Sequence, residues 1–465
     1  MGNIVVVGAQ WGDEGKGKVV DHEAQDAHAV VRYQGGANAG HTLVVRGETT
    51  ILHLIPSGAL NPYAQVVLAD GMLNHFGKLR AEEARLPASH SLEGRLHISK
   101  LSSVVTPYQI AEDVRRELSN GGIGSTKNGM GPCAEDIFGK RGLMAGHLLE
   151  NRAMARHLLE KQKAHWRSDI PVDIVLDELL RDVEPYGDVV KMTGPMISQW
   201  YADGKKIVFE GAQGGMLDPK TGSYPYVTST YTGANGIGVG IGAVVPLDRI
   251  IGIVKLTKSK VGDGPFPTEL VDETRLNEEF MAEVYAAHPR FDSYKIEDQN
   301  SARKEVSETY KLTSAERQIV QDPMHPDYQH VSGKQLGIEG GEFGAKTGRP
   351  RRMGHLDAAV VKHVAGVNGL TGLALTKLDC LGGIERLSVA VGYEGHNEFP
   401  LFNLDTAVPI YETMPGWQKE EVAGARRWDD LPGNAQAYVR RIEELVGVPV
   451  QYIGTGQNRK DLIVL

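Results

Sequence analysis

The chain has few cysteines, no long apolar run and no basic leader segment. Only Cys133 and Cys380 occur among its 465 residues. Two distant cysteines make neither a disulfide framework nor a zinc site, and they favour a reducing compartment. No run of about 18 apolar residues predicts a membrane span, and the N-terminus leads directly into a strand-like "NIVVV". We therefore expect a cytoplasmic protein with no signal peptide and no membrane span.

Positively charged residues are outnumbered by acidic ones. Lys and Arg number 50 against 59 Asp and Glu, which gives a formal net charge of -9. Because phosphate backbones and acidic membranes are bound by concentrated positive charge, this balance argues against a general nucleic-acid or membrane binder. Local basic clusters could still serve a small phosphorylated ligand.

Short apolar runs rich in β-branched residues alternate with helical patterns along the chain. This alternation predicts an α/β fold with a large, mostly parallel sheet flanked by helices. The length allows two to four domains or one elaborated α/β unit. The expected strands are 4–7, 29–33, 66–68, 207–209, 250–256, 373–378, 387–391 and 450–453, and the expected helices are 107–118, 149–166, 274–288, 355–367 and 434–446.

Two segments differ from this pattern. Residues 232–243, "TGANGIGVGIGA", are rich in glycine interleaved with apolar residues, which indicates either close backbone packing or a ligand loop. Residues 289–336 are polar, with few apolar positions before Tyr310 and Leu312. We expect this second segment to be an inserted excursion outside the core.

The stretch "GAQWGDEGKGKVVD", residues 8–21, resembles a phosphate-binding loop without matching its usual pattern. It follows a strand and precedes Val19-Val20, where a helix could begin, so its backbone N–H groups could hold an anion at the helix N-terminus. A tight turn with surface lysines is the alternative. Asp13 and Glu14 would repel a phosphate unless a magnesium ion lies between them or a carboxylate acts as a base.

Three further stretches present polar groups near strand ends. "YQGGANAGHT" (33–42) places Asn38, His41 and Thr42 among small residues, which favours a ligand role for His41 over a structural one. "GAKTGRPRRMG" (344–354) carries arginines that could bind carboxylates or phosphates, although a solvated basic turn would look the same. "LTKLD" (375–379) matches the guanine-reading element of GTP-binding proteins, a short pattern that also occurs by chance.

Taken together and in order, these stretches resemble the adenylosuccinate synthetase family, which joins IMP to aspartate using GTP. The resemblance covers most of residues 2–271 and 337–464, and it says little about 272–336. It implies one catalytic domain over 1–465 with P-loop-like nucleotide-binding architecture, smaller subdomains and an atypical insertion at about 289–336. The motifs are "QWGDEGKGK" (10–18), "NAGHT" (38–42), "HLIPSG" (53–58), "FEGAQG" (209–214), "YPYVTS" (224–229), "VGDGPFPTEL" (261–270), "EFGAKTGRPRR" (342–352), "LTKLD" (375–379) and "YETMPGW" (411–417).

The resemblance implies a two-step reaction at one site. Asp13 would take the N1 proton of IMP so that the 6-oxygen attacks the γ-phosphate of GTP, and the amine of L-aspartate would then displace the phosphate from C6. His41 would donate to the developing charge, and Lys16 would face the transferred phosphoryl group. Asp13 and the carbonyl of Gly40 would hold Mg²⁺.

The resemblance also assigns binding residues to each substrate. GTP would contact Gly12, Asp13, Glu14, Gly15, Lys16, Gly17, Lys18, Gly40, His41, Thr42, Arg351, Lys377, Leu378, Asp379, Gly454, Thr455 and Gly456. IMP would contact Asp13, Lys16, Asn38, Ala39, Gly40, His41, Thr126, Lys140, Gln213, Thr228 and Arg349. Aspartate would contact Ala345, Lys346, Thr347, Gly348, Arg349 and Arg351. Lys140 would reach the neighbouring subunit of a homodimer.

Several of these positions depart from the family's usual residues. The familiar "TTGRGIGP" is "STKNGMGP" here, and Lys140 is a point charge where the family usually has an arginine fork. The departures leave open a variant nucleotide such as dGMP, but Asp13 favours IMP, because a related phage branch that uses dGMP usually lacks that acid. A third hypothesis is a catalytically silent nucleotide sensor. The presence of Asp13, Lys16 and His41 argues against it, because a sensor needs no base. The departing residues are Ala37, Lys127, Asn128, Lys140, Lys346, Pro350 and Gly454.

Overall fold

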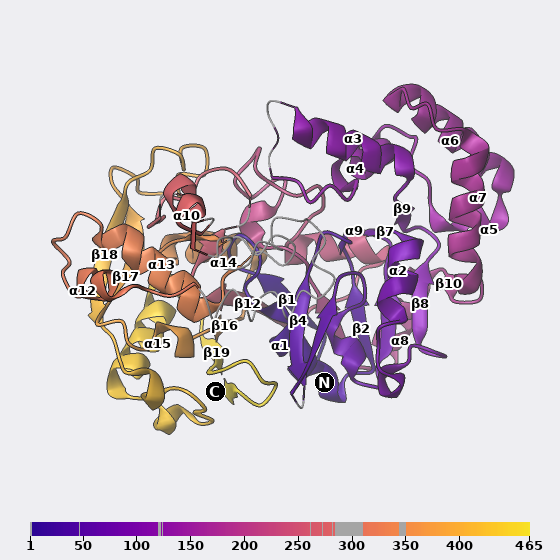
Figure 1. Ribbon diagram of the computed structural model, residues 1–465. Coiled ribbons are helices and arrows are strands. Elements are labelled where there is room, and N and C mark those ends of the chain that lie inside the picture. Colours follow the sequence, from indigo (N-terminus) through magenta and orange to yellow (C-terminus); the bar gives the residue numbers. More distant parts are fainter. Residues whose placement is uncertain are drawn as a thin grey trace.

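The computed structural model describes residues 2–45, 47–119, 122, 124–260, 262–271, 273–280, 282–283, 310–343 and 350–465. A large twisted sheet runs through the molecule, with helices packed against it (Figure 1). This 10-stranded sheet has the order β10-β8-β6-β2-β11-β1-β12-β16-β19-β20. Neighbouring strands are parallel except β19 and β20, so the predicted mostly parallel α/β sheet is confirmed.

Seven of the ten strands of the main sheet were expected from the apolar runs, whereas β8, β10 and β20 were not. Their bounds are β1 Ile4–Gly8, β2 Ala29–Arg32, β6 Gln65–Leu68, β8 Leu96–Ser99, β10 Val190–Lys191, β11 Ile207–Glu210, β12 Arg249–Lys255, β16 Gly372–Thr376, β19 Val450–Gly454 and β20 Leu462–Val464. Alternate residues of β1 belong to different cores, because Val5 and Val7 join the largest apolar cluster while Ile4 and Val6 join a second one. Burial on both faces explains why this strand is apolar throughout.

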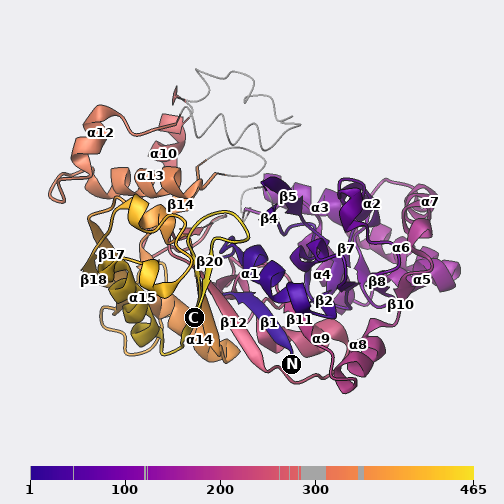
Figure 2. The same cartoon turned by 90° about the horizontal axis from the view of Figure 1, so that it is seen from below.

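Helices cover the sheet, and α3 to α7 lie toward the end of the molecule that carries β8 and β10 (Figure 1 and Figure 2). Beneath α5, α6 and α7 lies a separate apolar core that includes Leu148, Leu159 and Leu176. The helices are α1 Lys16–Glu23, α2 Phe76–Glu83, α3 Pro107–Leu118, α4 Met130–Phe138, α5 Ala145–Glu150, α6 Arg152–Trp166, α7 Val172–Val183, α8 Thr193–Ala202, α9 Ile237–Ile241, α10 Glu273–Phe280, α12 Ser314–Ile319, α13 Tyr328–Gly340, α14 Ala358–Asn368 and α15 Gly433–Val446.

Small sheets complete the described part of the fold. They comprise β3 Gly35–Gly36 with β7 Met72–Asn74 and β9 Ser103–Val104, β4 His41–Val45 with β5 Glu48–Leu52, β13 Ser259–Lys260 with β14 Arg352–Met353, and β15 Leu356–Asp357 with β17 Arg386–Tyr393 and β18 Pro409–Pro415. The expectation that 387–391 joins the large sheet is therefore wrong. Buried and less buried residues mix along β17, as befits a strand covered mainly on one face.

Two other expectations are corrected by local contacts. The helix expected at 149–166 is divided into α5 and α6, because the side chain of Asn151 caps α6 by accepting from the N–H of Met154. Residues 289–336 are described only from Tyr310 onward, and Tyr310 and Leu336 belong to the largest apolar core. That end of the segment is therefore part of the core and not an excursion from it.

The glycine-rich stretch 232–243 serves close backbone packing. A Cβ on Gly240 would lie 2.2 Å from the carbonyl oxygen of Tyr33, and Gly71 donates to the carbonyl of Gly240. This contact supports the first of the two interpretations left open by the sequence, close backbone packing.

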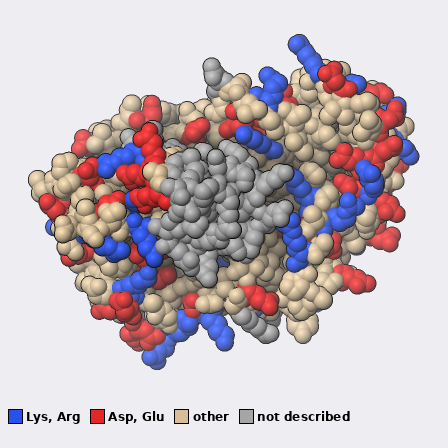
Figure 3. Space-filling view, viewed as in Figure 1, with Lys and Arg blue, Asp and Glu red and all other residues tan. Residues whose placement is uncertain are grey.

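None of the described helices is both long enough and apolar enough to cross a membrane. Acidic and basic side chains are interspersed over the face seen in Figure 3.

Candidate functional site

A cavity of about 960 Å³ opens at the carboxyl ends of the central strands. The loops that follow β1, β2, β11, β12, β16 and β19 all contribute to its wall, and β1 lies between the two halves of the sheet. Such a position is where open α/β sheets bind ligands. The predicted residues that line it are Gly12, Asp13, Glu14, Gly15, Lys16, Gly17, Lys18, Asn38, Ala39, Gly40, His41, Thr42, Thr126, Gln213, Thr228, Arg351, Lys377, Asp379, Gly454 and Gly456.

The loop after β1 is shaped for an anion at the start of α1. Gly15 occupies the N-cap position in the left-handed conformation and has no side chain to cover the helix end. The next residue, Lys16, adds a cation beside the helix N-terminus, where negative charge is favoured. Asp13 is also left-handed, with φ of 58°, although it is not glycine. Such backbone strain concentrates at functional sites, and Gln213 and Lys377, which line the same cavity, share it.

Glu14 holds this loop in place through its carboxylate. The side chain is fully buried, and its Oε1 accepts from the backbone N–H groups of Gln10 at 3.1 Å and Gly12 at 2.8 Å. Its Oε2 lies 2.7 Å from Nζ of Lys16. The second acid of the motif therefore neutralises the lysine and shapes the turn from within.

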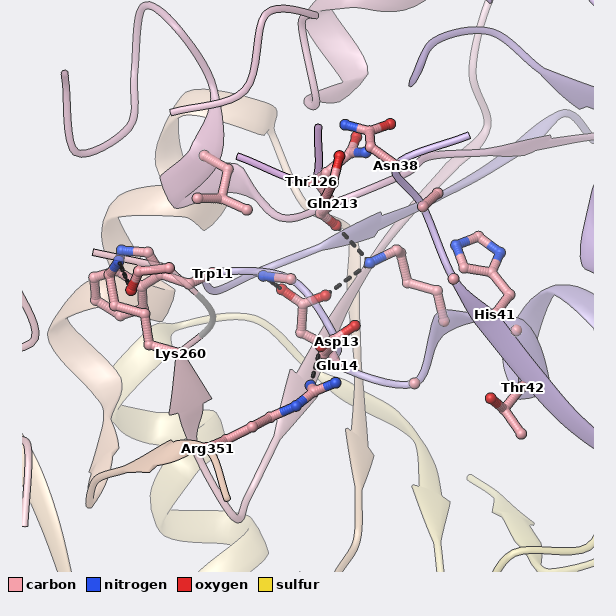
Figure 4. Close-up of a pocket in the computed structure, with 18 of the residues that line it drawn as sticks. Trp11, Asp13, Glu14, Asn38, His41, Thr42, Thr126, Gln213, Lys260 and Arg351 are labelled. Atoms are coloured by element: carbon pink, nitrogen blue, oxygen red, sulfur yellow. Dashed lines mark hydrogen bonds and ion pairs between the residues drawn. The ribbon is translucent and has the colours of Figure 1, made fainter. Parts of the chain in front are cut away.

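Asp13 points into the cavity and forms an ion pair with Arg351 (Figure 4). Its carboxylate is 34% exposed. Removal from water would raise the pKa of Asp13, but the charges of Arg351 and Lys255 outweigh that effect and lower it. Asp13 is therefore ionised at neutral pH, as a base or a metal ligand must be.

Glu342 gathers the cations on this side of the cavity. It is 3% exposed, and its Oε2 lies 3.0 Å from Nζ of Lys255 and 3.8 Å from Nη1 of Arg351, while Oε1 pairs with Lys377. Burial would raise the pKa of Glu342, but these three cations together hold it far below its usual range. The buried carboxylate thus fixes both the guanine-motif lysine and the arginine that reaches Asp13.

His41 is backed by a second buried carboxylate. Its Nδ1 contacts Glu210, and Oγ of Ser57 lies 3.1 Å from the same nitrogen. Glu210 also accepts from the backbone N–H of Ser57 at 2.7 Å and lies 4.0 Å from Nη1 of Arg32. Burial lowers the pKa of His41, while the charge of Glu210 opposes that shift. With Nδ1 directed at Glu210, Nε2 is the ring nitrogen available to a ligand.

Polar amides and hydroxyls form the opposite wall, where Asn38, Thr126 and Gln213 lie close together in Figure 4. Nδ2 of Asn38 is 3.5 Å from Oγ1 of Thr228. Within the described part of the chain, the side-chain Oε1 and Nε2 of Gln213 and the Oδ1 of Asn38 are buried and have no hydrogen-bond partner. Because buried polar atoms are normally satisfied, these groups are suited to a polar ligand.

The guanine-type loops are only partly in the cavity. Lys377 and Asp379 line it, and burial raises the pKa of Asp379. Leu378 is fully buried in the largest apolar core instead. Thr455 is buried too, and its hydroxyl donates to the carbonyl of Ala425. Any contact of these two residues with a ligand would have to come from the backbone.

Other predicted residues lie elsewhere. Lys140 is exposed, in a left-handed turn directly after α4, and does not line the cavity. The aspartate-loop residues Ala345, Lys346, Thr347, Gly348 and Arg349 lie outside the described residues.

A sequence profile of the adenylosuccinate synthetase family matches residues 5–463. The chain belongs to the adenylosuccinate synthetase family. The adenylosuccinate synthetase of Trichlorobacter lovleyi is 38% identical over 484 residues, with 100% of this chain and 99% of the relative covered. The fully ligated adenylosuccinate synthetase from Plasmodium falciparum superposes with a TM-score of 0.81 at 29% identity, covering 99% of each chain.

A more distant solved structure shares only the fold. It is the succinoaminodeoxyadenylate synthetase of cyanophage S-2L bound to dGMP and dATP, with a TM-score of 0.56 and 17% identity, covering 100% of this chain and 95% of that one.

Within this adenylosuccinate synthetase fold, Glu210 and Glu342 are functional candidates that the sequence did not single out. Each lies inside a motif that carried the resemblance, "FEGAQG" or "EFGAKTGRPRR". An acid inside an otherwise small or basic motif is the available signal. Its purpose depends on partners that are distant in sequence, namely His41 for Glu210 and Lys255 for Glu342.

Proposed function

We propose that the chain joins IMP to L-aspartate with GTP as phosphoryl donor, releasing adenylosuccinate, GDP and phosphate. The observation that carries the proposal is the meeting of Asp13, Lys16 and His41 in one cavity with the guanine-type Asp379. Membership of the adenylosuccinate synthetase family over residues 5–463 supports the same reaction.

In the first step, the ionised carboxylate of Asp13 accepts the N1 proton of IMP. The 6-oxygen then forms a bond to the γ-phosphorus, and the bond from that phosphorus to the β–γ bridging oxygen breaks, so that GDP leaves. In the structure, Arg351 forms an ion pair with the carboxylate of Asp13. Arg351 must release this carboxylate when substrates bind, and aspartate or phosphate oxygens can then pair with Arg351 instead.

In the second step, the amine of aspartate forms a bond to C6 of the purine. The bond from C6 to the phosphorylated oxygen breaks and inorganic phosphate leaves, with the amine losing a proton. A 6-oxo group is a poor leaving group and its phosphate ester a good one, which is the chemical reason for consuming GTP. We assign the substrate carboxylates to Arg349 and Arg351, in the segment 345–351.

Lys16 and His41 would act on the charge that moves during phosphoryl transfer. Lys16 lies at the N-terminus of α1, where oxygens of the transferred group are favoured. His41 must be protonated to donate from Nε2, and the anionic phosphates would raise its pKa in the same direction as Glu210 already does. Glu210 is thereby a positioning residue that holds the ring through Nδ1.

The residues present fit a magnesium ion shared with the substrate. The carboxylate of Asp13 and the backbone of Gly40 line the same cavity, and Mg²⁺ is commonly held by one or two carboxylates together with phosphate oxygens. Among the described residues there is no cluster of three or more His, Cys, Asp or Glu side chains suited to a metal. When bound, the ion would neutralise the phosphate charge.

We assign IMP to the wall formed by Asn38, Thr126, Gln213 and Thr228, and guanine to Lys377 and Asp379. We further propose a cytoplasmic homodimer in which Lys140 serves the neighbouring site. Its exposure and its distance from the cavity of its own chain are compatible with that role.

A substrate panel tests the proposal. Purified protein with GTP, Mg²⁺ and aspartate should convert IMP to adenylosuccinate far faster than it converts dIMP, GMP or dGMP. Faster turnover of dGMP would assign the chain to 2-aminoadenylosuccinate synthesis instead. No product from any of the four, in protein that melts cooperatively, would refute the ligase assignment.

A further inference from the structure

One wall of the cavity is organised by a short chain of hydrogen bonds that runs inward from α2. Nζ of Lys78 lies 2.6 Å from Oδ1 of Asn128. Nδ2 of Asn128 lies 3.1 Å from Oγ1 of Thr126 and 3.3 Å from the carbonyl oxygen of Ala37. Asn128 is 5% exposed, whereas Thr126 lines the cavity.

The direction of each hydrogen bond in this chain is determined by chemistry. A lysine ammonium only donates, so the atom of Asn128 that faces it must be the amide oxygen. The amide nitrogen then faces Thr126 and Ala37, and it donates to both. Oγ1 of Thr126 accepts that hydrogen bond, which leaves its own hydrogen to be donated elsewhere.

The loop that carries this chain is held firmly from behind. Asp113 on α3 accepts from the backbone N–H of Gly129 at 2.8 Å and from the hydroxyl of Ser125 at 2.7 Å. Lys127 and Gly129 are left-handed, with φ of 57° and 75°. The backbone around Thr126 is thus set by Asp113, while Asn128 controls the orientation of the hydroxyl.

We propose that Asn128, oriented by Lys78, is a positioning residue that makes the Thr126 hydroxyl a dedicated donor to an acceptor oxygen of the nucleoside monophosphate. The charge of Lys78 polarises the amide and so strengthens the donor at the far end of the chain. The inference rests on the proposed function, which places IMP on this wall. It also gives a use to Asn128 and Ala37, two positions at which the chain departs from the family motifs.

Asn128→Asp is the most informative variant. Its carboxylate still accepts from Lys78 but has no hydrogen to give, so the Thr126 hydroxyl turns toward it and is lost to the ligand. We expect Kd and KM for IMP to rise about tenfold or more, with kcat and the KM for GTP changed less than about threefold. Thr126→Val should weaken IMP binding to the same extent. Thr126→Ser keeps the hydroxyl group and should bind IMP nearly as tightly as the wild type.

A double-mutant cycle separates positioning from general damage. If Asn128 acts through Thr126, the double variant N128A/T126V should bind IMP no more weakly than T126V alone. Lys78→Met, which changes no residue of the loop itself, should produce a smaller loss of the same kind. Asn151→Ala is the matched control, because it removes a helix-capping asparagine outside the cavity and should leave IMP binding unchanged.

Additive losses in the double variant, or wild-type IMP affinity in N128D, would overturn the proposal. Calorimetric binding of IMP is measured separately from turnover, so the two assignments can fail independently. A wild-type protein that binds IMP but makes no adenylosuccinate would refute the proposed function while the cycle still tests the role of Asn128.

Discussion

The contact between His41 and Glu210 leads to a sharp prediction for Glu210→Gln. The substitution keeps the size of the side chain, but it removes the negative charge behind the imidazole. The groups that face His41 are then Arg32 and Lys16, both positive, and both disfavour the protonated ring. A hydrogen bond to a charged group contributes about 1.5–3 kcal/mol, so we expect kcat to fall about 10- to 100-fold.

The pH dependence gives the second readout. Donation from Nε2 requires protonated His41, so kcat should decline on the alkaline side as the loaded enzyme loses that proton. Without Glu210 the pKa of His41 falls further, and the decline should begin at lower pH than in the wild type. Steady-state kcat for IMP at saturating GTP and aspartate between pH 6 and 9 would show the displacement.

Ser57→Ala is the matched control for this experiment. Its hydroxyl donates to Glu210 at 3.0 Å, so the variant loses a hydrogen bond to the same carboxylate but keeps the charge. We expect kcat to change by only about a few-fold and the alkaline limb to stay in place. A wild-type rate and pH profile in Glu210→Gln would refute the proposed role of Glu210.

Three further predictions concern the base, the guanine loop and stability. Asp13→Asn should reduce turnover to below about 1% while GTP affinity stays within about threefold in a calorimetric titration, and unchanged turnover would exclude Asp13 as the base. Asp379→Asn should raise the KM for GTP about tenfold or more without changing that for IMP, since an amide cannot accept two guanine hydrogens as a carboxylate does, and an equal rise for both nucleotides would contradict a guanine-specific role. Burial and the charge of Lys258 lower the pKa of His355 from 6.5 to about 4. The unfolded chain therefore binds this proton more readily than the folded one. As the pH falls from 6.5 toward 4, His355 lowers the free energy of unfolding by at most about 3 kcal/mol, and above pH 6.5 it has no such effect. His355→Gln should lessen the fall in melting temperature between pH 6.5 and 4.5, and a fall as steep as that of the wild type would speak against this source of acid sensitivity.

Much of the architecture was accessible from pattern alone. Apolar β-branched runs marked seven of the ten strands of the main sheet, because a parallel strand is buried on both faces, as Val5 and Val6 show. The same rule misassigned 387–391, since a short apolar run does not reveal which sheet it joins. The capping role of Asn151 was likewise invisible in the apolar periodicity that suggested one long helix.

The residues of the candidate site were likewise only partly predictable from the sequence. Asp13, Lys16 and His41 could be named from sequence because each lies in a short motif directly after a strand, where glycines set the backbone path. Their partners could not be named. Glu210 meets His41, and Glu342 meets Lys255, only because β1, β2, β11, β12 and β16 bring their carboxyl ends to one edge of the sheet.

The two acids of the first loop show the distinction most clearly. The sequence by itself determined that two carboxylates stand beside a lysine at a helix start, because neighbours in a loop are covalently held together. Only the tertiary structure decided their separate uses. Glu14 turns inward to the loop's own N–H groups, whereas Asp13 faces the cavity and Arg351, whose position depends on how distant strands pack.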